Sequence, residues 1–291
     1  MIEITYRIDP NDRDLGPVPT TPQEARRLLE EGNRGFSALL DLSKTSDEVS
    51  RRVIRVSAAD LGMTGDGSVL QHNPFALVVG CADARVPIEL IFGQGVNDLF
   101  VLRVAGNVLG EEILGSIDYA LQYLPSLRLI VVLGHTMCGA VTAAAGAFLD
   151  PAKYLGLSAD HELRSIVNQL FPAVRLSYAS MIRTWGDDAV RHDGFLPGLI
   201  ETSAVVNAAL MAASLRSEIS SQGLEGVKTV FSLYDVRTLR VGVRGVSDDE
   251  TLDIRLLDPP PDSDGFDRLS LDVAAGPVVS ALMTSESASI R

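Results

Sequence analysis

The chain has 291 residues, 46% of them hydrophobic, so it can bury a large core and a generally disordered state is excluded. Its formal net charge of −13 disfavours nucleic acid and anionic membranes as partners, because both select clustered Lys and Arg side chains. Neither a signal peptide nor an apolar run of the roughly 18 residues that a membrane span needs is predicted. Two cysteines are too few for a disulfide framework. We therefore expect a soluble, cytoplasmic protein whose cysteines bind a metal or take part in catalysis.

The first predicted element is a helix that begins at "TPQE", residues 21–24. This stretch combines a capping Thr, a Pro at the first helical position and a Glu three residues after the cap. Leu28 and Leu29 continue an apolar stripe, and Gly32-Asn33 are predicted to end the helix. Residues 36–74 are predicted to form a loop-rich insertion, because most of this stretch is polar, charged and interrupted by glycines.

Short apolar runs alternate with helical spacing in the next part of the chain. Buried strands are predicted over residues 75–79, 99–104 and 127–133, each rich in Val, Ile and Leu. Between the last two, residues 113–124 carry apolar side chains at helical spacing until Pro125. This order of strand, helix and strand predicts a parallel sheet with right-handed crossovers.

The C-terminal half begins with two long helical patterns, over residues 161–182 and 199–221. A pair of strands is predicted at 227–234 and 239–243, and residues 258–291 are predicted to be a weakly structured tail after "LLDPPPDSDGFD". No repeat or change in composition divides the chain. We therefore expect one α/β domain, residues 1–291, with a mainly parallel central β-sheet flanked by helices.

Residues suited to metal binding follow two of the predicted strands. "VVGCADARVPIEL" places Cys81, Asp83 and Arg85 after the first strand, and "IVVLGHTMCGAV" places His135 and Cys138 after another. Because the carboxyl ends of parallel strands meet at one edge of a sheet, these residues are predicted to share a site. Two thiolates and one imidazole suit a Zn²⁺ ion, one per chain, and leave the fourth tetrahedral position open.

Asp83 has two alternative roles in such a site. It could occupy the fourth position and silence the metal, or accept hydrogen bonds from Arg85 and orient a zinc-bound hydroxide. Each signal also has an ordinary explanation when taken alone: a cysteine that packs as a small apolar residue, a chance His-x-x-Cys spacing and a surface ion pair. The joint arrangement at one sheet edge favours the metal site.

The motifs resemble those of the β-class carbonic anhydrases. "CADAR" followed by Val-Pro is similar to their C-x-D-x-R signature, "HTMC" to their H-x-x-C, and "EEGNRGF" to their N-terminal helix motif. The intervening "DLFVLRVAGNVLG" and "LGSIDYAL" are also similar to the family's core. The resemblance implies a β-carbonic anhydrase-like fold with an N-terminal helical arm, acting as a homodimer or tetramer whose cleft is completed across the interface.

The resemblance also implies the reaction, the reversible hydration of CO₂ to bicarbonate and a proton by zinc-bound hydroxide. It implies zinc ligation by Cys81, His135 and Cys138, with Asp83 as fourth ligand or as the partner of Arg85 in a catalytic pair. The expected partners are the small-molecule substrate, CO₂ or bicarbonate, and further copies of the chain, whereas neither nucleic acid nor a membrane is expected.

Three residues are predicted substrate contacts. The family usually has a Gln just before the first strand, whereas "QHNPFALVVGC" places His72 at that position and Gln71 one residue earlier. Either a slip in the loop presents Gln71, or His72 acts as donor or proton shuttle, since a histidine titrates near neutral pH. Gly139, directly after Cys138, is the third candidate.

Two other functions remain open at this point. The first is hydrolysis of another linear heteroallene, CS₂ or COS, which needs the same hydroxide. The second is a non-catalytic zinc-binding or regulatory protein in which Asp83 permanently caps the metal.

Overall fold

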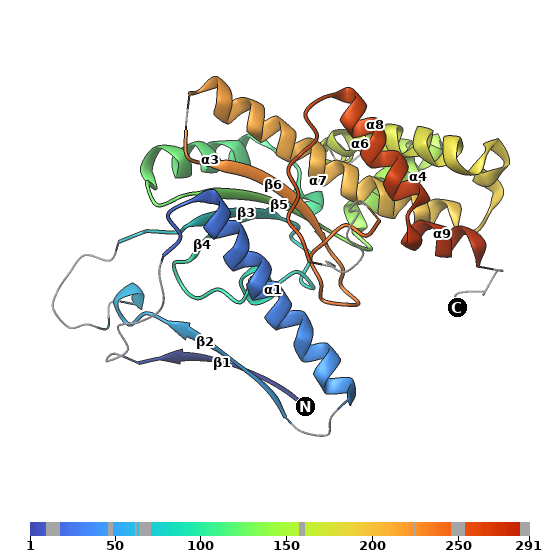
Figure 1. Ribbon diagram of the computed structural model, residues 1–291. Coiled ribbons are helices and arrows are strands. Elements are labelled where there is room, and N and C mark those ends of the chain that lie inside the picture. The colour runs from blue at the N-terminus through green and yellow to red at the C-terminus, as the bar shows by residue number, and fades with distance from the viewer. Residues whose placement is uncertain are drawn as a thin grey trace.

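The computed structural model describes residues 1–9, 18–45, 49–61, 63, 71–156, 161–223, 225–245 and 254–285. A four-stranded sheet in the order β4-β3-β5-β6 lies at its centre, and all three strand pairs are parallel (Figure 1). Its strands are β3 (Ala76–Gly80), β4 (Leu99–Arg103), β5 (Leu129–His135) and β6 (Lys228–Tyr234). The predicted parallel α/β sheet is thus confirmed.

Helices cover both faces of this sheet, which is why β3 and β5 are continuous apolar runs without exposed residues. Side chains alternate along each strand: Leu77 and Val79 face one core cluster, while Ala76 and Val78 face the other. The first cluster packs against a thick helical layer. That layer contains α3 (Glu111–Tyr123), α4 (Gly139–Leu149), α6 (His161–Trp185), α7 (Phe195–Ser221), α8 (Ser263–Ala275) and α9 (Pro277–Thr284).

Helix α7 lies at the centre of this layer. It is apolar and long enough to resemble a membrane span, but 67% of its most apolar window is buried inside the protein. It contacts β5, β6, α4, α6, α8 and α9. Its composition is therefore that of a core helix.

The opposite face of the sheet is covered by α1 (Pro22–Thr45) and α2 (Ile88–Phe92). The predicted start of α1 is confirmed: the backbone N–H of Glu24 donates to Thr21 Oγ1, and the Glu24 carboxylate accepts from the backbone N–H of Thr21. The predicted end at Gly32-Asn33 is wrong. Gly32 is required by close packing, because a Cβ there would lie 1.7 Å from the carbonyl oxygen of Phe92.

Asn33 is likewise a packing residue of the helix interior. Its amide donates to the carbonyls of Ile91 and Leu239 and accepts from the backbone N–H of Val241. These long-range bonds compensate the low helix propensity of Asn, so α1 continues past it. The helix end could not be read from local sequence.

Two further sequence predictions are corrected by the structure. Residues 36–74 are not simply a loop: they contain the end of α1, the strand β2 (Ser50–Val56) and a short 3₁₀ turn at Ala59–Leu61, while residues 46–48, 62 and 64–70 lie outside the described part. Strand β2 pairs in parallel with β1 (Ile2–Ile8) in a separate two-stranded sheet. The predicted strand at 239–243 makes only an isolated bridge, between Val241 and Tyr234.

The C-terminal tail is also ordered, contrary to the prediction. Asp262 accepts a hydrogen bond from the backbone N–H of Gly265 at 2.8 Å and so caps α8, and α9 follows directly. Leu269 and Val279 from these helices are buried in the core. The Pro/Asp-rich stretch thus leads into a helix and does not begin an unstructured tail. Residues 286–291 lie outside the described part.

Candidate metal centre

Three side chains from different elements converge at the carboxyl edge of the sheet. Cys81 follows β3, His135 is the last residue of β5, and Cys138 is the N-cap residue of α4. The two sulfur atoms are 4.0 Å apart, and all three ligand atoms lie within 4.8 Å of one another. The residues are 4%, 0% and 1% exposed. The structure therefore brings together the predicted Cys81, His135 and Cys138 as a group that could hold a metal ion.

The donor geometry fits zinc. Tetrahedral Zn–S bonds of about 2.3 Å place two sulfurs roughly 3.8 Å apart, close to the separation seen here. His135 Nδ1 lies 2.9 Å from the carbonyl oxygen of Thr136, whereas its Nε2 is buried and has no hydrogen-bond partner among the described residues. A buried polar atom without a partner is unfavourable, and a metal ion at Nε2 removes that penalty. The carbonyl fixes the tautomer, since Nδ1–H must donate to it.

The two cysteines differ in proton affinity. The pKa of Cys81 is lowered to about 4, chiefly by the hydrogen bond from Cys138 and further by the backbone N–H groups of Asp83 and Gly106. The same bond to Cys81, together with burial, raises the pKa of Cys138 far above its usual value. Without a metal, the pair therefore holds one thiolate and one thiol at neutral pH.

Asp83 and Arg85 form a bidentate ion pair beside the three ligands. Arg85 donates from Nε to Asp83 Oδ1 at 3.0 Å and from Nη2 to Oδ2 at 2.6 Å. This contact lowers the pKa of Asp83 well below its usual range, chiefly through the side-chain hydrogen bond. Asp83 Oδ2 is also 4.0 Å from His135 Nε2. The carboxylate thus lies next to the ligand group but is hydrogen-bonded to Arg85.

Other residues support this arrangement and were not identified from the sequence. Arg103, at the end of β4, donates to the carbonyl oxygens of Cys81 and Asp83. The backbone N–H of Gly106 donates to Cys81 Sγ at 3.4 Å, and Asn207 of α7 donates to the carbonyl of Gly106 at 2.9 Å. Arg103 could have been identified from the sequence, since it is a cation at the end of a predicted strand, at the same sheet edge as the ligands. Asn207, on a distant helix, had none.

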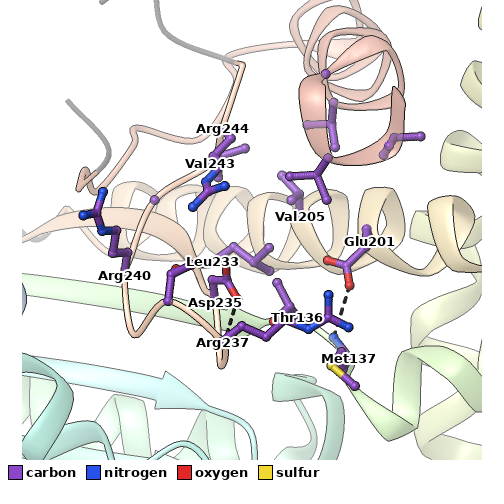
Figure 2. A pocket seen from close by; sticks show the side chains of 16 residues that line it. Thr136, Met137, Glu201, Val205, Leu233, Asp235, Arg237, Arg240, Val243 and Arg244 are labelled. Atoms are coloured by element: carbon purple, nitrogen blue, oxygen red, sulfur yellow. Dashed lines mark hydrogen bonds between the residues drawn. The ribbon is translucent and has the colours of Figure 1, made fainter. Parts of the chain in front are cut away.

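The segment from His135 to Cys138 is called the ligand loop below. A cavity of about 260 Å³ lies beside it, between α7, α9 and the turn after β6. Figure 2 shows Glu201 of α7 extending from one wall of this cavity toward Met137, which stands between His135 and Cys138 in the chain. Burial raises the pKa of Glu201. Neither residue was singled out in the sequence, where a glutamate inside a helix carries no special signal.

Gln71 and His72 lie away from this group in their own chain. Both are exposed and precede β3, whereas Cys81 follows it; the five residues of β3 span about 16 Å at roughly 3.3 Å per residue. The His72 ring packs against that of Phe100, with centroids 5.7 Å apart. Their contact with substrate stays a prediction, and it requires a second chain.

Gly139 lies directly beside the ligand group as the first residue of α4. A Cβ built at this position would meet no atom within 4 Å. The space next to Cys138 is therefore open, and the role of Gly139 as a substrate contact stays a prediction.

Comparison with known proteins identifies carbonic anhydrases as relatives of this chain. The family model described as "Carbonic anhydrase" matches residues 76–193. Carbonic anhydrase 2 of Mycobacterium tuberculosis is 35% identical over 220 residues, which is 76% of this chain and 93% of that protein. A carbonic anhydrase of Mycolicibacterium smegmatis is 31% identical over 223 residues, covering 75% and 92%.

A solved tetrameric β-carbonic anhydrase of Sordaria macrospora is also similar, at 25% identity and a TM-score of 0.42, covering 58% of this chain and 79% of that one. The assignment depends on the two mycobacterial relatives, which match nearly their whole length, and on the family model, which begins at β3 and includes all three converging residues. This chain belongs to the β-carbonic anhydrase family.

Proposed function

We propose that the protein is a zinc-dependent carbonic anhydrase that converts CO₂ and water reversibly into bicarbonate and a proton, with one zinc ion per chain. The observation that carries the proposal is the convergence of two cysteine sulfurs and an unpartnered His135 Nε2 beside a carboxylate that an arginine holds. Three protein ligands leave one position of a tetrahedral zinc open, as a catalytic metal requires.

The three metal-binding residues and Asp83 have different roles in the proposed reaction. Zinc, when bound, lowers the pKa of a coordinated water toward 7 and so supplies a nucleophile at neutral pH. Cys81, His135 and Cys138 would hold the ion, and the hydrogen bond from His135 Nδ1 to the Thr136 carbonyl fixes the imidazole. Asp83 is ionised and can only accept hydrogen bonds, so it would accept the hydrogen of the nucleophile and leave that oxygen's lone pair directed at CO₂.

Arg85 decides where the Asp83 carboxylate lies. In the structure it holds both carboxylate oxygens, which would leave the fourth position of a bound zinc ion open. Because Asp83 Oδ2 is already 4.0 Å from His135 Nε2, a small rotation away from Arg85 brings it within reach of the metal. We propose that Asp83 then becomes the fourth ligand and stops the reaction, so that Arg85 acts as a latch.

We also propose that the protein works in the cytoplasm as a homo-oligomer, at least a dimer. Both cysteines are free thiols, which a reducing compartment preserves. The rings of Phe100, Tyr119 and Tyr123 form a chain of contacts at the β4 edge of the sheet, and the two tyrosines are 48% and 59% exposed. Burial of these aromatic rings against a second copy would stabilise a dimer.

A stopped-flow CO₂-hydration assay between pH 6 and 9, with zinc content measured on the same samples, tests the proposed activity. We expect rates far above the uncatalysed reaction in zinc-loaded protein and a loss of rate when a chelator removes the metal. Zinc-loaded protein that is inactive at every pH would refute the proposal and favour a capped, non-catalytic zinc protein. Faster turnover of COS or CS₂ than of CO₂ would reassign the substrate.

A further inference from the structure

Glu201 is a carboxylate inside the helical layer that the proposed reaction does not use. It lies in the second turn of α7 and is half-buried, on the wall of the cavity beside the ligand loop. Its Oε1 accepts a hydrogen bond from the backbone N–H of Met137 at 3.3 Å, marked by a dashed line in Figure 2. Removing a carboxylate from water, even in part, is unfavourable unless it has such partners. The position of Glu201 beside the ligand loop therefore suggests that it has a function there.

Met137 has an unusual backbone conformation. Its φ is +58°, in the left-handed region that glycine adopts freely and other residues adopt rarely. It lies between the two ligands His135 and Cys138, so its conformation determines how the chain passes from one ligand to the other. A strained residue of this kind persists only where its surroundings hold it in place.

Hydrogen bonds hold the Met137 residue from two sides. Glu201 binds its N–H, while Arg85 Nη2 donates to its carbonyl oxygen at 3.2 Å. The same Nη2 donates to Asp83 Oδ2 at 2.6 Å. A continuous series of hydrogen bonds therefore leads from α7 through Met137 and Arg85 to the Asp83 carboxylate.

We propose that Glu201 is a positioning residue: by accepting from the Met137 N–H, it keeps the ligand loop in its left-handed turn and places the Met137 carbonyl that holds Arg85 against Asp83. The inference rests on the proposed function, because it assigns Glu201 to the same reaction. Glu201 acts through Met137 and Arg85 and not on the substrate. The Met137 N–H needs only a hydrogen-bond acceptor, so the neutral amide of a glutamine at position 201 should hold it as well as the carboxylate does.

The test compares E201A, which removes the acceptor, with E201Q, which retains an acceptor oxygen. E218A, on the same helix but outside the cavity, is the matched control. The double variant E201A/M137G is the rescue, because glycine adopts positive φ without external support. If E201A does not fold, E201L takes its place, since leucine fills the site without an acceptor. Two quantities are measured: kcat and KM for CO₂ hydration, and the rate of zinc transfer to a chelator.

We expect E201A to lower kcat and to speed zinc release, each by about tenfold, as is common for residues that orient metal ligands, with KM changed less than about twofold. E201Q and E218A should stay within about twofold of the parent protein, and E201A/M137G should recover most of both losses. Recovery by glycine would identify the turn conformation as what Glu201 maintains.

Three results would overturn the inference. The first is an E201A variant with unchanged kcat and unchanged zinc release. The second is an E201Q variant as impaired as E201A, which would mean that charge matters and not the acceptor. The third is a double variant no better than E201A. The zinc-release measurement needs no turnover, so it separates failure of this inference from failure of the proposed activity.

Discussion

Asn207→Leu is the substitution that best isolates the support of a metal ligand from the ligand itself. Asn207 is 1% exposed, and its Nδ2 donates to the Gly106 carbonyl at 2.9 Å, while the Gly106 N–H donates to Cys81 Sγ at 3.4 Å. Leucine has similar volume but no donor, so the Gly106 carbonyl loses its side-chain partner and the Gly106 N–H is free to turn away from the sulfur.

The magnitude follows from these contacts. A buried carbonyl left without a partner costs about 1–3 kcal/mol. Asn207 Oδ1 is itself buried and has no hydrogen-bond partner in the described part of the chain, so its removal offsets part of this loss. We therefore expect the free energy of unfolding of the metal-free protein to fall by about 1–2 kcal/mol. Zinc affinity should fall by about tenfold, because the N–H that supports the Cys81 thiolate is no longer fixed.

Urea unfolding of the metal-free protein and competition with a chromophoric chelator measure the two effects. Asn168→Leu is the control, because Asn168 is exposed and bonds only the Tyr154 hydroxyl in the described contacts; it should change stability by less than about 0.5 kcal/mol and leave zinc affinity unchanged. If Asn207→Leu lowered stability but left zinc affinity at the parent value, the Gly106 hydrogen bond would have no part in holding the metal, and the reasoning would fail.

Three further predictions concern the site itself. Arg85→Leu should lower CO₂ turnover by at least about a hundredfold while zinc content stays near one per chain, because Asp83 is freed to cap the metal; stopped-flow rates and metal analysis check this, and unchanged turnover would contradict the latch. Zinc binding at pH 6, where a coordinated water with a pKa near 7 stays mostly neutral, should release about one proton, and affinity should rise about tenfold per pH unit there, because the lowered pKa of Cys81 and the raised pKa of Cys138 leave one proton on the cysteine pair for the metal to displace. Calorimetry in two buffers measures the release, and two released protons would refute it. Gly139→Ala should not lower the urea midpoint, since a Cβ there meets open space and alanine restricts the unfolded chain more than glycine does; a lowered midpoint would contradict the packing.

The central sheet and the ligand group were predictable from the sequence. Continuous apolar runs mark β3 and β5 up to its final residue His135, because strands covered on both faces contain few polar side chains. Cys81 directly follows β3 and His135 ends β5, and parallel strands end at a common edge, so these two residues had to approach each other. Local patterns and one topological rule were sufficient.

The wrong predictions for the end of α1 and for the C-terminal tail concern segments whose structure depends on contacts with residues distant in the sequence. Gly32 and Asn33 look like a helix end, but one is a close approach to Phe92 and the other bonds segments more than fifty residues away. The C-terminal tail looked unstructured because of its Pro/Asp-rich start, whereas Asp262 serves as a helix cap. Local composition cannot distinguish these alternatives, since the stabilising partners are elsewhere in the sequence.

The residues around the ligands were the least predictable part. Asn207 and Glu201 lie within a helix made mostly of apolar or small residues. Nothing in the spacing of these two residues along the sequence relates them to the metal ligands. Their function depends on which backbone group each meets, Gly106 or Met137, and that is determined by the packing of α7 on the sheet.

The most direct test of the central claim is a zinc titration of metal-free protein followed by stopped-flow CO₂ hydration at each step. If Cys81, His135 and Cys138 hold a catalytic metal, the hydration rate will rise in proportion to added zinc and level off at one equivalent per chain. Binding of one equivalent of zinc with a rate that stays at the uncatalysed value throughout would contradict the account.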